Sequence, residues 1–217
     1  MNSKPTPNEE LSFDDVYVLH DPLANQPLRL DPPDEVSKGT LEGLFRGEMT
    51  LSEPLELRAS MGGRAMDILW GMVIPVIVIS SRVVALFQEH GFTGWSTYPV
   101  RVFGRKGEPI EGYHGFAVTG RVGYRVFELS KIVITPPAVP TGPPRQMVRG
   151  LYFDRSAWDG SDIFLMPEAD LIFIRGRVKK TLNKAKIRNI RFVSVHDWEL
   201  PAYAYREEQL AKVGKKS

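Results

Sequence analysis

Two segments of the chain align without a gap at an offset of 95 residues. The first is IVISSRVVALFQEHGFTGWSTYPV, from Ile77 to Val100, and the second is FIRGRVKKTLNKAKIRNIRFVSV, from Phe173 to Val195. The match is in pattern more than in identity, and it pairs Ile79 with Ile174, Arg82 with Arg177, Val83 with Val178, Phe87 with Leu182, Phe92 with Ile187 and Val100 with Val195. An internal repeat restricts a chain to folds built from similar units.

Each segment predicts a strand, a short helix and a second strand. PVIVI before Ser80 and DLIFI before Arg175 are apolar runs typical of buried strands. Ser80 is a good helix N-cap, and Gly91 suits the left-handed position after a helix. A helix of about three turns is just long enough for a parallel crossover, and an antiparallel return is the alternative. We therefore expect an α+β fold, a mixed sheet with short helices and two strand-helix-strand pseudo-repeats at 75–100 and 170–195.

The chain of 217 residues suits one domain or two small ones. We expect a flexible N-terminal tail over 1–14, a single α+β domain over 15–200 and a C-terminal tail over 201–217. The segment 21–40 is rich in proline and aspartate and predicts a loop. The segment 135–146 holds five prolines and predicts an extended loop that joins the two pseudo-repeats.

The composition excludes several classes of protein and site. The chain has no cysteine, which excludes disulfides, thiolate catalysis and cysteine-ligated zinc. The longest apolar run, from Ile68 to Ile79, is about half of the roughly 20 residues that a membrane helix needs. No secretory signal is visible at the polar N-terminus, so we expect a cytoplasmic protein without membrane contact.

Charge is unevenly distributed along the chain. Residues 1–60 hold 12 acidic and 5 basic residues, about −7, whereas the remainder holds 14 acidic and 23 basic residues, about +9. Two explanations stay open: the two parts pack against each other, or one of them faces a charged partner.

Several motifs occur in a recognisable order: VYVL near the start, GGRAMDILW, VISSRVVALFQEHGFTGWSTYPV, and later WDGSDIFLMPEADLIFIRGRVKKTLNKAKIRNIRFVSV. Together they resemble the myxobacterial-type immunity protein family of bacterial polymorphic toxin systems, formerly a domain of unknown function. The second segment departs from the family pattern, because Asn189 stands where glycine is usual. The resemblance covers about 16–195 and implies a cytoplasmic protein that binds and neutralises a cognate toxin, which is encoded next to it. It carries over no catalytic residue.

The sequence offers little evidence for an enzyme, a cofactor or a metal site. It has no phosphate-binding loop, nucleophile elbow, HExxH or EF-hand motif. His196, Asp197 and Glu199 could bind a metal but more often form a solvated turn. A catalytic cluster of Asp154, Asp159 and Asp162 is conceivable, but aspartates in such positions usually cap turns.

A basic run is the strongest candidate for a binding site. Eight cations lie within 17 residues with no acid among them: Arg175, Arg177, Lys179, Lys180, Lys184, Lys186, Arg188 and Arg191. We expect Lys179, Lys180, Lys184, Lys186 and Arg188 to bind an acidic surface of a protein partner. For this run, a solvated helix face and nucleic-acid binding through the second repeat are the alternatives. For the protein's function, an enzyme with an unrecognised site is a further alternative.

Overall fold

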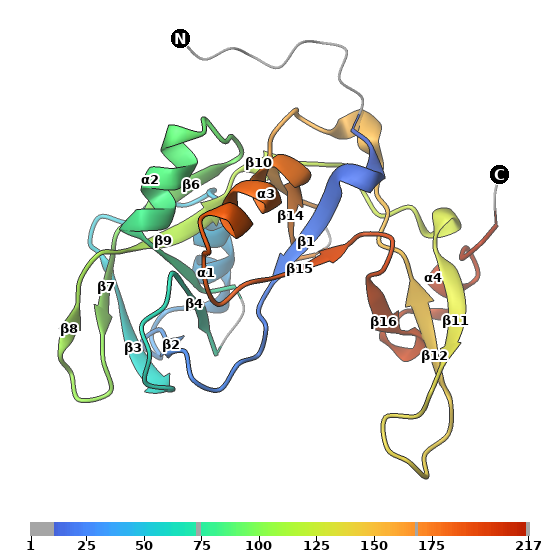
Figure 1. Cartoon of the computed structure of the whole chain (residues 1–217), viewed down its shortest axis with the longest axis horizontal. Coiled ribbons are helices and arrows are strands. Elements are labelled where there is room, and N and C mark those ends of the chain that lie inside the picture. The colour runs from blue at the N-terminus through green and yellow to red at the C-terminus, as the bar shows by residue number, and fades with distance from the viewer. Residues whose placement is uncertain (1–10, 73–74, 168, 216–217) are drawn as a thin grey trace.

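A computed structural model describes residues 11–72, 75–167 and 169–215. Its strands form three sheets (Figure 1). In the largest sheet the spatial order is β6 (Trp95–Tyr98), β9 (Tyr113–Val118), β5 (Ile77–Ser80), β4 (Ile68–Gly71), β2 (Arg29–Asp31), β3 (Leu55–Met61), β7 (Val100–Phe103) and β8 (Pro109–Ile110). The second sheet has the order β10 (Gly120–Arg121), β13 (Ile163–Leu165), β14 (Ile172–Arg175), β1 (Val16–His20) and β15 (Arg191–Ser194).

The third sheet is small and lies at one end of the molecule, where its hairpin loop projects outward (Figure 1). It consists of β11 (Lys131–Thr135), β12 (Arg145–Arg149) and β16 (Glu199–Pro201). Residues 136–144 of the proline-rich segment form the loop of the β11–β12 hairpin, and its ends, Thr135, Arg145 and Gln146, lie in the two strands. Since proline lacks a backbone donor, this loop cannot extend the strand pairing.

The helices are short: α1 (Lys38–Phe45), α2 (Ser81–Glu89), α3 (Gly176–Lys184) and α4 (Glu207–Leu210). Single 3-10 turns are η1 (Phe13–Asp15), η2 (Phe127–Leu129), η3 (Arg155–Ala157) and η4 (Ala202–Ala204). Ser80 caps α2 as expected, because its hydroxyl accepts a hydrogen bond from the amide of Val83. The fold is α+β with mixed sheets and a few short helices, as the sequence predicts.

The two predicted units have the same order of elements. Strands β5 and β6 both pair antiparallel with β9, and β14 and β15 both pair antiparallel with β1. The two strands of each unit are therefore parallel to each other, with one strand between them. The hairpin before each unit also matches, since Ile68 pairs with Ile79 in one and Ile163 with Ile174 in the other. That the two units superpose as copies of one another stays a prediction.

The two halves of the chain exchange strands. β1 belongs to the first half of the sequence but lies between β14 and β15, whereas β9 of the second half lies between β5 and β6. β2 and β10, in contrast, pair within their own halves of the chain: β2 is parallel to β4, and β10 is parallel to β13. The orders β6-β9-β5-β4-β2 and β15-β1-β14-β13-β10 are thus equivalent.

One hydrophobic cluster joins the two units. The buried face of α2 contributes Val83 and Phe87, and the buried face of α3 contributes Val178 and Leu182. These side chains repeat at helical spacing, so each helix buries one stripe against the sheets. The exchanged strands and the common core make each unit depend on the other for its burial.

Two expectations need correction. Residues 1–10 lie outside the described residues, but Leu11 is buried and η1 follows it, so the ordered chain begins before residue 15. Segment 21–40 is not all loop, because it contains β2 and the start of α1, which the Ser37 hydroxyl caps. The predicted C-terminal tail, 201–217, contains η4 and α4.

Candidate partner-binding site

The basic run lies on β14, on α3 and on the segment that follows α3. Val178 and Leu182 are buried, so the opposite face of α3 carries Lys180 and Lys184 into solvent. Lys186 and Arg188 continue this exposed surface beyond the helix, and Lys179 is half-buried at its margin. The structure therefore brings all five predicted residues to one short segment, but it gives them different surroundings.

Some cations of the run are bound within the fold. Nε of Arg175 is 3.2 Å from Oδ2 of Asp15, and Nε of Arg177 is 2.5 Å from Oδ1 of Asp162. The ammonium of Lys179 lies 3.5 Å from the centre of the Tyr17 ring, a cation–π contact. These contacts give Arg175 and Arg177 a structural role and hold Lys179 at the margin of the exposed surface.

Equivalent aspartates connect each unit to the other. Asp162 accepts hydrogen bonds from the amide and hydroxyl of Thr93 as well as from Arg177. Asp67, which lies 95 residues earlier, accepts the amide of Arg188 at 3.0 Å and pairs with Arg82 at 3.1 Å. Each carboxylate therefore binds the arginine in the first turn of its own unit's helix and the segment after the helix of the other unit.

The side chain of Arg188 takes part in this network only weakly, in contrast to its backbone amide. Its Nε is 3.8 Å from Oδ2 of Asp67, and the side chain is largely exposed. A long ion pair with one partner in solvent contributes little to stability. The guanidinium is therefore available to a partner at small cost.

Lys180, Lys184 and Lys186 have no ion pair or hydrogen-bonded side-chain partner within the described part of the chain. At the offset of 95, α2 and the residue after its cap carry Ala85, Glu89 and Gly91 in their place. The unit can therefore form without these lysines. Lys186 also has a φ of +54°, in the left-handed region where the equivalent Gly91 has +58°. A side chain in this region raises the backbone energy by about 1 kcal/mol. The fold does not require a side chain here, because glycine occupies the equivalent position of the first unit.

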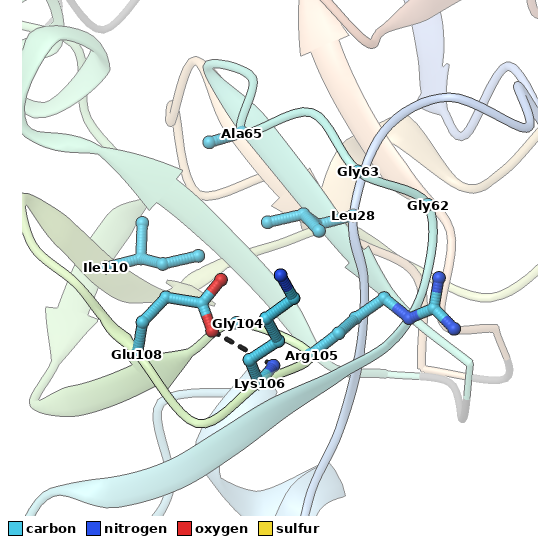
Figure 2. A pocket seen from close by; sticks show the side chains of 9 residues that line it. All are labelled: Leu28, Gly62, Gly63, Ala65, Gly104, Arg105, Lys106, Glu108 and Ile110. Carbon is cyan, nitrogen blue, oxygen red and sulfur yellow. Dashed lines mark hydrogen bonds between the residues drawn. The ribbon is translucent and has the colours of Figure 1, made fainter.

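A second candidate is an open cavity of about 530 Å³ beside the β7–β8 turn (Figure 2). Arg105 and Lys106 lie on one side, and Gly62 and Gly63 of the β3–β4 connection lie on the other. Glu108 accepts a hydrogen bond from the amide of Lys106, which closes the turn between β7 and β8 (Figure 2). The charged side chains here suit contact with an acidic group. They do not form a nucleophile–base arrangement.

A third cavity, of about 240 Å³, lies between the two units. Its lining is mainly apolar and includes the equivalent pairs Val76 with Leu171 and Ile77 with Ile172. His20 borders it, and burial of the ring lowers the pKa of His20 from its ordinary value. The imidazole Nδ1 donates to the carbonyl of Asp21, which leaves Nε2 as the acceptor in the neutral ring.

The other candidate residues bind neighbouring groups. Asp154 accepts the amide of Ser156 and Asp159 the amide of Ser161, so both cap turns. Asp162 instead belongs to the network between the units. Across residues 11–72, 75–167 and 169–215, histidine, aspartate and glutamate side chains nowhere gather in a group that could hold a metal ion.

His196, Asp197 and Glu199, which the sequence allows as metal ligands, likewise do not gather into a metal-binding group. Nε2 of His196 contacts Asp14, and its Nδ1 lies 2.9 Å from the Tyr152 hydroxyl. Glu199 pairs with Arg149 on the neighbouring strand. These contacts hold the N-terminal turn and β16 in place.

Comparison with known families identifies the chain. The profile of an immunity protein family, Imm11, matches residues 3–197. The chain belongs to the Imm11 immunity protein family. Membership indicates a toxin-neutralising function and a toxin as partner. A search of curated proteins gave no match. Among the described residues of this Imm11 protein, no helix combines the length and apolar character needed to cross a membrane.

Proposed function

We propose that this Imm11 protein acts in the cytoplasm and neutralises one cognate toxin by stoichiometric binding, and that the toxin is encoded beside it. The family match supports the immunity role. We further propose that Lys179, Lys180, Lys184, Lys186 and Arg188 contribute to the interface, with Lys180, Lys184 and Lys186 as its centre. The partner surface is acidic.

The observation that carries this assignment is the contrast between α3 and α2. Both helices bury equivalent apolar stripes, but only α3 exposes lysines, Lys180 and Lys184, that have no ion pair or side-chain hydrogen bond within the described chain. Exposed, unpaired charge of one sign increases the rate of association with an oppositely charged partner and helps to exclude wrong partners. A toxin has to be distinguished from related toxins, so charge complementarity suits the task.

The test replaces Lys180, Lys184 and Lys186 together with glutamate in cells that produce the toxin. Folding should survive, since exposed charge changes are usually worth within about 0.5 kcal/mol each, while protection should be lost. A charge-matched control replaces Lys38, Lys212 and Lys215, which are also exposed, with glutamate. The control should protect like the wild-type protein.

The competing role is nucleic-acid binding, and the same variants separate the two. A nucleic-acid binder loses affinity steeply with salt, because each neutralised phosphate releases counterions. If purified wild-type protein binds duplex or single-stranded nucleic acid with such a slope and does not bind the toxin, the immunity proposal is wrong. If the triple α3 variant folds and protects fully, the basic surface is not the interface.

A further inference from the structure

We propose that β11 is a docking edge at which an extended segment of the toxin adds as a further strand to the three-stranded sheet. This inference rests on the immunity function proposed above. It concerns a surface different from α3 and a different kind of contact, namely backbone hydrogen bonds along a strand edge.

The edge of β11 is open in the described part of the chain. β11 is at the end of the order β11-β12-β16 and pairs only with β12. It has five residues, whereas the other edge strands, β6, β8, β10, β15 and β16, have two to four. Two of those, β8 and β16, contain a proline, which limits strand addition. β11 contains none.

Two residues of β11 direct their backbone groups outward. The amide of Gly150 donates to the carbonyl of Trp198, on the β16 side of β12. Backbone groups alternate sides along a strand, so Val148 also faces β16, while Met147 and Arg149 face β11. The N–H and C=O groups of their partners, Val133 and Lys131, therefore point toward β12 and form hydrogen bonds with it. The N–H and C=O groups of Ile132 and Ile134 point to the open edge.

The side chains of the same two residues are exposed. Ile132 is 47% exposed and Ile134 is 64% exposed. They are two residues apart and share one face of the sheet. Exposed β-branched residues on a free edge favour aggregation unless a partner covers them. An added strand would cover both side chains and satisfy both pairs of backbone groups.

The charges on the other face of the sheet, opposite Ile132 and Ile134, indicate which kind of segment binds the edge of β11. Lys131 and Arg145, which pairs across from Thr135, are exposed at the two ends of that face. A second copy pairing antiparallel about Val133 would put its Lys131 opposite Thr135, in one row with Arg145 and about 10 Å from it. Such pairing would gather the cations of both copies on one face, without an acid to balance them. An acidic partner avoids this repulsion. The fitting segment therefore has apolar residues on one face and acidic residues on the other.

The test measures binding of purified variants to the toxin against which the wild-type protein protects. Ile134→Pro removes an outward donor without removing a hydrogen bond to β12, and it should weaken binding at least tenfold. Lys131→Glu should also weaken it. Ile134→Val keeps both the strand and the apolar contact and should bind like the wild-type protein. Thermal unfolding of each variant shows whether the fold is kept.

Hydrogen exchange gives a second readout that does not depend on substitution. The amides of Ile132 and Ile134 should exchange fast in the free protein and slowly in the complex, whereas that of Val133 should be slow in both. If a folded Ile134→Pro variant binds normally, or these amides stay fast in the complex, the docking edge is wrong while the immunity function stands. If Ile134→Pro instead converts a wild-type dimer to a monomer, the occupant is a second copy and the proposal is also wrong. If no toxin is neutralised, the immunity function fails and this inference fails with it.

Discussion

At the scale of single residues, two buried carboxylates matter more to the fold than the many surface ion pairs. Asp162 holds Arg177 and the Thr93 segment together, and Asp67 holds Arg82 and Arg188. We expect Asp162→Ala to lower the free energy of unfolding by roughly 2 to 3 kcal/mol, because the Thr93 groups lose a charged acceptor. Arg177 is half exposed, so its share is smaller. Urea unfolding measures the change, and a loss below about 0.5 kcal/mol would show that the contact is not structural.

His20 makes stability depend on pH. Burial lowers its pKa in the folded state, and Arg191 across the strand pair acts in the same direction. The unfolded chain therefore binds the proton more readily, so stability is full above the ordinary pKa of about 6.5. This contribution of His20 to stability is lost as the pH falls below about 6.5 and through the lower pKa of the folded state. His20→Gln should make the loss between pH 7.5 and 5.5 smaller in chemical unfolding, and an unchanged loss would contradict this role of His20.

At the scale of elements, Lys186 separates stability from binding. It occupies a left-handed position where the equivalent unit has Gly91. Lys186→Gly should therefore stabilise the fold by about 1 kcal/mol and weaken protection. Lys186→Ala is the matched control, because it removes the charge but keeps a side chain at this φ, so it should weaken protection without the gain. A glycine variant that is no more stable than the alanine variant would show that the backbone strain is absent.

Local patterns explain why the elements of the two units could be predicted. The apolar runs, the cap at Ser80 and the turn at Gly91 act within a few residues of one another. The pairing of β1 with β14 could not be predicted, because alternation marks a strand but does not identify its neighbour. For the same reason the sequence showed the basic run but not which of its cations form ion pairs within the fold. Arg177 pairs with Asp162, whereas Lys180 has no side-chain partner in the described chain.

At the scale of the whole molecule, the exchanged strands make the two units one cooperative structure. The strand at the centre of each unit comes from the other half of the chain: β1 lies between β14 and β15, and β9 lies between β6 and β5. We expect a single unfolding transition, with the same midpoint by circular dichroism and by tryptophan fluorescence. Two separate transitions would mean that the units are stable independently.

Severing the chain tests the same exchange in another way. The β7–β8 turn between Gly104 and Glu108 is exposed, and a cut there separates β1 from β14 and β9 from β5. Fragments 1–106 and 107–217 should remain unfolded alone and should form a folded 1:1 complex when coexpressed. A fragment that folds alone would contradict the dependence of each unit on the strand of the other.

Direct binding to the neighbouring toxin tests the central claim, which is neutralisation by a stoichiometric complex through the α3 lysines. Calorimetric titration of the purified toxin with the wild-type protein should give one complex of 1:1 stoichiometry, with an affinity that decreases as salt increases. The Lys180, Lys184 and Lys186 glutamate variant should bind far more weakly, and the Lys38, Lys212 and Lys215 control should bind normally. Absence of binding by the folded wild-type protein to a toxin that it neutralises in cells would contradict the account.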